Sequence, residues 1–193
     1  MSATARDDQI AAFLRVLDPA DTSTGGGTAS AIAGAMAAAL VAMVSHLSAG
    51  PDAAEPVAYY EDIAQAGNAL TAALLEGADE DTRAFASVRA AYRLPRESEV
   101  EVAARRAAIQ SGLINAARVP LRNAQRCAQV AALVGRLEGR ANPRVTSDLQ
   151  CAAYLARAGL QGCLANVDIN LPSIKEPVAA EEIRTQARDL RLT

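Results

Sequence analysis

The chain has 193 residues, a formal net charge of −3 and a sequence pI near 5.3, and only 3% of its residues are aromatic. This length suits one domain with a sizeable core, so we expect a single domain over residues 1–193. An acidic chain with no block of Lys and Arg, and few aromatics to stack on bases, argues against a nucleic-acid partner. The polar start, MSATARDDQ, does not resemble a secretory signal, and we expect a cytoplasmic protein.

The first two predicted helices cover residues 6–17 and 24–47. The second contains no Asp, Glu, Lys or Arg, and alanine dominates it. Its larger side chains recur about one helical turn apart: Ile32, Met36, Leu40, Met43, Val44 and Leu47. A helix that is apolar on every side is buried in a core or a membrane. Because no Lys or Arg flanks this run, we interpret it as the central helix of a helical bundle and expect no membrane.

Further helices are predicted at residues 57–75, 79–94, 97–117, 121–137, 147–167 and 179–190. Gly77 is expected to separate two of them, and Pro120 to kink or restart another. Ser147 and Gln150 match the capping-box pattern, so the helix after it should begin there. No segment alternates with period two. The predicted fold class is all-α, a single-domain helical bundle, and it should be oligomeric because one subunit buries an all-round apolar helix only with difficulty.

The number and spacing of cysteine and histidine residues limit the metal sites that the chain could form. Cys127, Cys151 and Cys163 have neither a zinc spacing nor an even number for disulfides, so we expect free, buried thiols. His46 is the one histidine, which excludes a His-rich metal site. We therefore predict no metal and no cofactor.

The turn Gly25-Gly26-Gly27-Thr28 is the first candidate site. Its backbone N–H groups would lie at the positive end of the helix that follows, where they could bind an anion or an oxyanion. It lacks the preceding strand of a dinucleotide fingerprint and the Gly-Lys-Ser/Thr of a phosphate loop. The alternative is a tight turn capped by Thr24 or Thr28. Three glycines exceed what a cap requires, because each costs chain entropy.

Four polar side chains are the other candidates. Asp81 is a general base if it faces a cavity, or otherwise an acid that complements a helix dipole. Asp148 is not explained by the predicted cap at Ser147. Asn166 and Asn170 lie four residues apart and would share one face of a helix, where buried amides are either network residues or ligand contacts.

Six short motifs occur in a telling order: GGG-T (25–28), D-x-x-A-F (81–85), A-Y-x-L-P (91–95), V-P-L (119–121), S-D (147–148) and N-V-x-I-N (166–170). Together, over about residues 8–172, they resemble the formiminotetrahydrofolate cyclodeaminase and methenyltetrahydrofolate cyclohydrolase family. The resemblance implies an all-helical homodimer or higher homo-oligomer, with a folate site around the glycine turn near a subunit interface and no metal or nucleotide. The small-molecule substrate would react at a C–N bond: cyclodeaminase expels ammonia as a ring closes, and cyclohydrolase adds water and opens the ring.

The resemblance assigns roles to the candidates. Asp81 would be the acid/base, and Asp148 would hold the N–H edge of the ligand. The ligand-binding set would be Gly25, Gly26, Gly27, Thr28, Arg144, Asn166 and Asn170.

Three departures from the family pattern are visible. Thr22-Ser23-Thr24 stands where the family usually has Pro-Thr-Pro, and Arg144 lies in place of a family asparagine. No lysine occurs in residues 49–57, where the family has a cluster that suits a polyanionic tail; this chain has Asp52 and Glu55 there.

These departures predict weak methenyltetrahydrofolate turnover and a smaller or less anionic ligand that pairs with Arg144. Two alternatives to a folate enzyme stay open. One is the same fold repurposed for a non-folate C=N or C–N ring reaction, and the other is a non-catalytic ligand-binding homologue.

Overall fold

The computed structural model describes residues 13–192, and these contain no strand. The helices are α2 (Gly26–Ser48), α3 (Val57–Tyr92), α4 (Glu99–Leu137), α5 (Thr146–Asn170) and α6 (Pro177–Leu190), with single 3-10 turns at Pro143–Val145 and Leu171–Ser173. Residues 13–17 are also helical, while residues 6–12 of the first predicted helix lie outside the described part of the chain. The predicted all-α class is confirmed.

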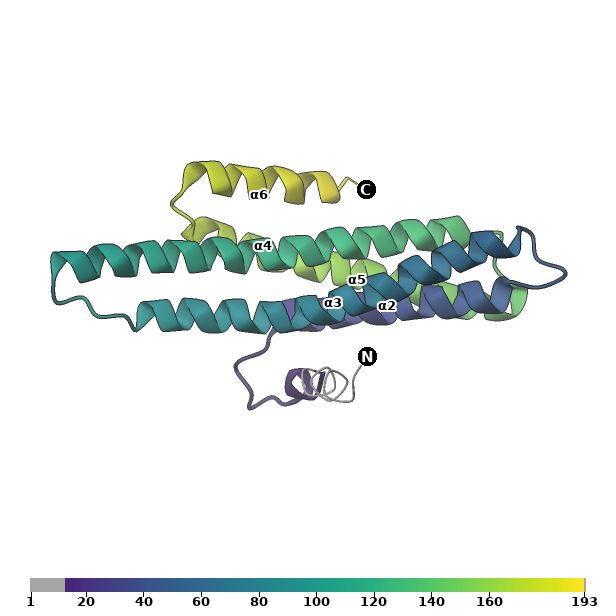
Figure 1. Ribbon diagram of the computed structural model, residues 1–193, viewed down its shortest axis with the longest axis horizontal. Helices are drawn as coiled ribbons and strands as arrows, with labels where there is room; N and C mark the ends of the chain where they lie inside the picture. The colour runs from purple at the N-terminus through teal and green to yellow at the C-terminus, as the bar shows by residue number, and fades with distance from the viewer. Residues whose placement is uncertain (1–12, 193) are drawn as a thin grey trace.

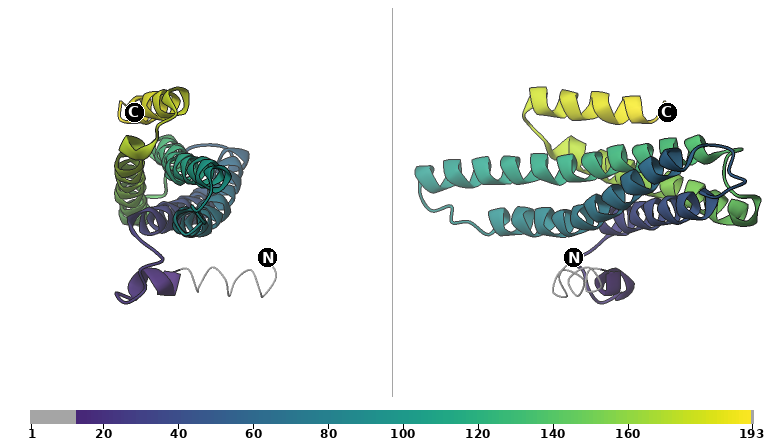
Figure 2. Two further views of the ribbon diagram at one scale, coloured as in Figure 1. Left: turned by 90° about the vertical axis from the view of Figure 1, so that its left-hand side faces the viewer. Right: turned by 45° about the vertical axis from the view of Figure 1, so that its right-hand side comes forward.

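Helices α2 to α5 form an up-and-down bundle in which each helix runs antiparallel to the next (Figure 1). Short connections favour this topology, because they leave consecutive helices as neighbours. Seen end-on, the four helices surround one core, and α6 lies outside them against α4 (Figure 2). A main core cluster joins all four helices, and a second joins the end of α3 with α4, α5 and α6.

Helix α2 packs through its small residues. Ala31, Ala37 and Ala38 are fully buried. A Cβ added at Gly34 would lie 2.5 Å from Cys127 Sγ, so only glycine allows α4 to approach this closely. The central, alanine-rich helix is therefore confirmed, and its packing depends on the absence of side-chain volume.

Of the six larger side chains predicted to line α2, Ile32 and Val44 are buried and Leu40 packs against the core, but the other three do not face it. Met36, Met43 and Leu47 are 44%, 38% and 51% exposed, and they lie on one outward stripe. Helix α2 is the one helix among residues 13–192 that is long and apolar enough to cross a membrane by length and composition, and 61% of its apolar window is buried inside the protein. Contacts with α3, α4 and α5 favour a core helix.

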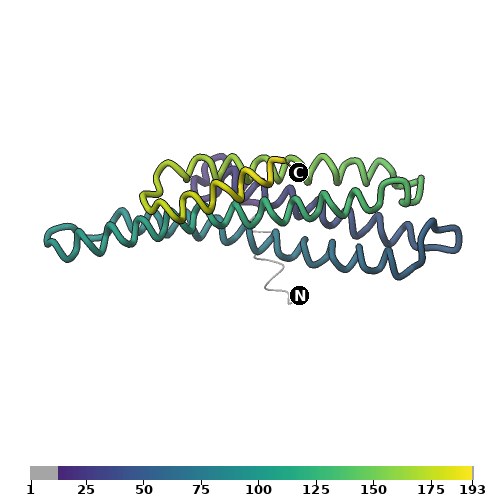
Figure 3. The backbone as a smooth tube through the Cα atoms, turned by 90° about the horizontal axis from the view of Figure 1, so that it is seen from above, coloured from purple at the N-terminus to yellow at the C-terminus, as the bar shows by residue number. Residues whose placement is uncertain are grey.

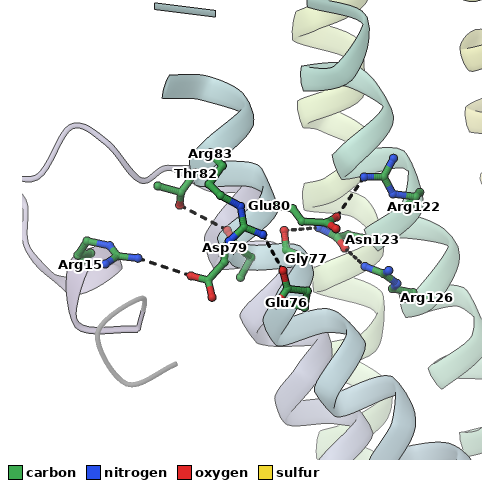
Figure 4. A network of polar contacts seen from close by, with 11 residues as sticks. Arg15, Glu76, Gly77, Asp79, Glu80, Thr82, Arg83, Arg122, Asn123 and Arg126 are labelled. Carbon is green, nitrogen blue, oxygen red and sulfur yellow. Dashed lines mark hydrogen bonds and ion pairs between the residues drawn. The ribbon is translucent and has the colours of Figure 1, made fainter. Parts of the chain in front are cut away.

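The predicted break at Gly77 is wrong, because α3 continues through it. Asn123 of α4 occupies the space that a side chain at residue 77 would need, and its Nδ2 donates to the Gly77 carbonyl at 3.1 Å (Figure 4). The glycine serves close packing between α3 and α4, and the extra hydrogen bond offsets the low helix propensity of glycine.

Pro120 also lies inside a continuous helix, so the predicted restart is wrong. Proline has no N–H to donate to the carbonyl four residues before it, which is that of Ala116. Asn170 Nδ2 of α5 donates to this carbonyl at 3.1 Å. One side-chain amide thus replaces the missing helical hydrogen bond.

Two further expectations need correction. Helix α5 begins at Thr146 behind Val145, which provides no side-chain cap, so Ser147 is not the predicted cap. The capping box lies instead at the start of α4, between Ser98 and Glu101.

All three cysteines are free, but Cys151 is exposed whereas Cys127 and Cys163 are buried.

Helices α3 and α4 are longer than the other two helices of the bundle. Their 36 and 39 residues correspond to roughly 54 and 58 Å, against roughly 35 Å for the 23 residues of α2. They therefore project past the N-terminal end of α2 as a helical hairpin, which we call the arm (residues 82–112; Figures 1 and 3).

Candidate functional site

The Asp81 carboxylate lies directly against the glycine turn. A Cβ added at Gly27 would lie 2.6 Å from both carboxylate oxygens, so any side chain there would displace the acid. The Thr28 hydroxyl donates to Asp81 Oδ2 at 3.0 Å. The structure thus brings together two motifs that are 53 residues apart in sequence.

The turn leaves backbone donors free at the positive end of α2. Gly25 precedes the helix, and the first helical hydrogen bond runs from Ala29 N to Gly25 O at 3.0 Å. Within residues 13–192, no acceptor takes the N–H of Gly26 or of Gly27. These two groups and the helix dipole favour a negative or carbonyl oxygen beside Asp81.

Burial raises the pKa of Asp81 above its ordinary value, although hydrogen bonds from the Thr28 side chain and backbone act in the opposite direction. The neighbouring acids are different, because each pairs with an arginine (Figure 4): Glu76 with Arg83, Asp79 with Arg15 and Glu80 with Arg122. Among the described residues Asp81 has no cationic partner. A carboxylate with raised pKa and no counter-ion can both accept and return a proton.

Asn166 borders the same turn. Its Nδ2 lies 3.3 Å from the position of a Cβ at Gly26 and donates to the Gly162 carbonyl at 3.0 Å. Asn170, one helical turn further, donates to the carbonyls of Ala116 and Asn166. Asn166 therefore belongs to the cluster around the glycine turn, whereas the Asn170 amide already has two partners within the subunit.

The other two predicted site residues lie at the opposite end of the bundle. Asp148 is in the first turn of α5, and the 18 residues to Asn166 correspond to a rise of roughly 27 Å. Arg144 lines a cavity of about 540 Å³ with residues from the end of α2, including Leu47 and Ser48. One subunit therefore does not unite Asp81 with Asp148 and Arg144.

The loop of residues 49–57 also lies at that far end, because it connects the end of α2 to the start of α3. Its Glu55 pairs with Arg140 Nε at 2.9 Å. Repulsion of an anionic tail by this loop does not reach the glycine turn of the same subunit. The predicted weakness of folate turnover therefore stays a prediction, because this loop can act only on the glycine turn of a second subunit.

Sequence reasoning did not place Cys163 near the site. Its thiol hydrogen-bonds with Cys127, and this contact, burial and the nearby Asp81 carboxylate raise its pKa. A thiol that stays protonated is a poor nucleophile, so Cys163 supplies packing beneath the carboxylate. The spacing of the cysteines contained no signal for this contact, which depends on how α4 and α5 pack.

The described residues contain no group of three or more His, Cys, Asp and Glu side chains placed to hold a metal. A cavity of about 700 Å³ is a groove between α3 and α4. Six of the ten residues that line it are alanine or leucine, and none is acidic. This groove therefore contains no carboxylate for acid/base chemistry.

The structure defines an all-helical protein in which one partly buried acid, Asp81, lies against a helix N-terminus. The Formiminotransferase-cyclodeaminase family model matches residues 9–189. The chain belongs to this family, and the family resemblance seen in its motifs is confirmed.

Individual relatives agree. The chain is 36% identical over 179 residues to methenyltetrahydrofolate cyclohydrolase from Methylorubrum extorquens, covering 92% of this chain and 86% of that protein. It is 31% identical to formimidoyltransferase-cyclodeaminase from Rattus norvegicus, covering 95% of this chain but only 34% of that longer protein. The crystal structure of formiminotetrahydrofolate cyclodeaminase from Thermotoga maritima superposes with a TM-score of 0.79 and 26% identity, covering 100% of this chain and 89% of that one. These relatives are enzymes that act on C–N bonds of folates, and they do not favour the alternatives of a repurposed or non-catalytic homologue.

Proposed function

We propose that this chain is a methenyltetrahydrofolate cyclohydrolase, with Asp81 as its general base and no cofactor. The supporting relative is the Methylorubrum extorquens cyclohydrolase, which is 36% identical to this chain and is covered over 86% of its own length. The structural observation on which the proposal depends is the Asp81 carboxylate, which is held against Gly27 with a raised pKa and no cation.

In this reaction, water adds to the amidinium carbon of the substrate. Asp81 accepts one proton of the water as the new C–O bond forms. One of the two C–N bonds to that carbon then breaks, the released nitrogen takes a proton, and the carbon becomes a formyl group. The net reaction consumes one water and releases one proton.

The glycine turn would bind the oxygen at the reacting carbon. The N–H groups of Gly26 and Gly27 lie at the start of α2, where Gly27 is next to Asp81, and they would stabilise the partial negative charge that develops on that oxygen. Asn166 Oδ1 has no donor among residues 13–192. It is therefore available to accept an N–H of the heterocycle, and this oxygen is its proposed ligand contact.

The proposed assembly is a homodimer. Met36, Leu40, Met43 and Leu47 form an outward apolar stripe along α2. A two-fold axis perpendicular to this stripe would pack two copies of α2 antiparallel. The Asp148 and Arg144 end of one copy would then approach the glycine turn of the other, which would restore the single site that the sequence motifs predict. A cytoplasmic location belongs to the same proposal.

Formiminotetrahydrofolate cyclodeaminase activity is the second candidate, supported by the Thermotoga maritima structure. The same carboxylate would then transfer a proton to the departing ammonia. The two activities are distinguished by supplying each substrate to the purified protein and following the methenyl chromophore, which cyclohydrolase consumes and cyclodeaminase produces. Turnover of roughly 1–10³ s⁻¹ with methenyltetrahydrofolate supports the proposal. Turnover of neither substrate would overturn it.

A further inference from the structure

We propose that Phe85 and Arg89 extend the site onto the arm, where Phe85 contacts the aromatic part of the substrate and Arg89 binds its carboxylate tail. The inference rests on the proposed function, because it identifies the part of the same site that selects an acidic aryl ligand. Neither residue transfers a proton in this proposal. Both bind the substrate.

Position along α3 is the first argument. Asp81, Phe85 and Arg89 recur every four residues, so they lie on one face of the helix. The same face packs against α2 further back, where Leu74 approaches Gly34 and Ala78 joins the cluster of Ala31 and Ile32. Helix α2 begins beside Asp81, so beyond that point no helix within residues 13–192 covers the exposed Phe85 and Arg89.

Phe85 is consequently exposed at the edge of the glycine turn. It is 48% exposed, one helical turn beyond Asp81, in a chain with only two phenylalanines. The Arg89 guanidinium lies 5.9 Å from the centroid of its ring. An exposed ring beside an acid/base is placed to cover one side of a planar ligand.

Arg89 is a cation without a carboxylate partner among the described residues. Two other arginines of the arm are engaged, Arg83 with Glu76 and Arg105 with the Tyr92 carbonyl. The arm contains six arginines and three glutamates, although the whole chain has a net charge of −3. The local field on the arm therefore favours an anion.

The spacing suits a ligand with a ring at one end and a carboxylate at the other. Eight helical residues separate Asp81 from Arg89, a rise of roughly 12 Å. Arginine binds carboxylates through two parallel hydrogen bonds. Arg89 would therefore supply a cation for the carboxylate tail. The loop of residues 49–57 contains no lysine and does not supply one.

The experiment compares two substrates and matched variants by steady-state kinetics. The substrates are methenyltetrahydrofolate and an analogue without any tail carboxylate, the methenyl derivative of tetrahydropteroic acid amide, in which a simple amide replaces the glutamate. For Arg89→Gln we expect KM for the glutamyl substrate to rise about tenfold with kcat retained, and KM for the analogue to stay unchanged. Phe85→Leu should raise KM for both substrates about 3- to 10-fold, and Phe85→Tyr should restore it.

Arg106→Gln is the matched control, since Arg106 is an exposed arginine on the other helix of the arm and has no ion pair among residues 13–192. An equal rise in KM with Arg106→Gln, or an equal effect of Arg89→Gln on both substrates, would overturn a specific contact with the tail. Unchanged KM in Arg89→Gln and in Phe85→Leu would overturn the inference and leave the cyclohydrolase assignment intact. Absence of turnover in the unmodified protein would instead refute the proposed function.

Discussion

The two ends of α2 contain the two halves of the predicted site, and they differ in how their polar groups are used. At the N-terminal end, the N–H groups of Gly26 and Gly27 and the Asp81 carboxylate lie together with few protein partners. At the C-terminal end, Ser48 Oγ accepts from Asn142 N at 2.9 Å, and the Asn142 side chain donates to the Leu47 carbonyl.

Asp81 and the glycine turn thus keep groups available to a ligand, whereas Ser48 and Asn142 are used within the fold. Polar groups that already bond one another stabilise the fold, whereas buried groups without partners are available to a ligand. Asp148 and Arg144 lie at the C-terminal end, so within one subunit they cannot share a ligand with Asp81. The following predictions test this contrast, beginning with the largest expected effect.

Replacing Asp81 should have the largest effect on rate. Asp81→Asn retains the size of the side chain and an acceptor for Thr28, but it removes the proton acceptor, so kcat should fall about 10²–10⁴-fold. Asp148→Asn should raise KM more than it lowers kcat. Steady-state kinetics with methenyltetrahydrofolate measures both, and similar small effects would mean that neither carboxylate takes part in the chemistry.

Replacing Gly27 should displace the carboxylate. The added Cβ of Gly27→Ala would overlap both oxygens of Asp81, and a misplacement of about 1 Å can cost about 10²-fold in rate. Gly25→Ala is the control, because nothing lies within 4 Å of a Cβ there. Helicity by circular dichroism should be nearly unchanged in both variants. Equal turnover in the two would contradict the role of the turn. Gly26→Val should abolish ligand binding with helicity nearly intact, because its side chain would fill the space beside Asn166 Nδ2 and the turn.

A charged substitution on the outward stripe of α2 tests whether this stripe forms the dimer interface. Met43→Arg would place an unpaired cation in the proposed dimer interface, and the dimer dissociation constant should rise at least about tenfold. Val178→Arg on α6, where the side chain is 76% exposed, is the control and should leave the assembly unchanged. Sedimentation or light scattering reports the result. A dimer unaffected by Met43→Arg would place the interface elsewhere.

The bond between Asn170 and the Ala116 carbonyl is tested by a double-mutant cycle. Asn170→Ala should lower the free energy of unfolding by about 1–2 kcal/mol, because it leaves that carbonyl without a donor. Pro120→Ala restores a backbone N–H at residue 120, so the Asn170→Ala cost should be smaller in that background. Denaturant unfolding measures all four proteins. Strict additivity would mean that the side chain does not replace the missing helical bond.

Asp81 should also make the stability of the fold depend slightly on pH. Because burial raises its pKa, the ionised form destabilises the folded state at pH values above that pKa, and this cost is relieved as the pH falls through it. Asp81→Asn should therefore melt slightly higher than the unmodified protein near neutral pH, with the difference shrinking under acid. The acidic limb of the unmodified enzyme's rate profile should lie above the ordinary aspartate pKa of about 3.9. A lower melting temperature for Asp81→Asn at neutral pH would contradict this cause.

Local patterns in the sequence predicted the helices and the glycine turn, because helical periodicity and glycine runs depend on neighbouring residues. They failed where a distant residue changes the outcome. Asn123 allows α3 to continue through Gly77, and Asn170 supports α4 at Pro120. In the sequence, Asp81 and Gly27 belong to two separate motifs. Their contact depends on how α2 and α3 pack.

The most direct test of the account is a crystal structure of the protein with a stable reduced folate bound. We predict the heterocycle beside the N–H groups of Gly26 and Gly27, with its reacting carbon near Asp81. Any contact with Asp148 would come from a second copy of the chain. A ligand bound only in the cavity beside Arg144, away from Asp81, would contradict the account.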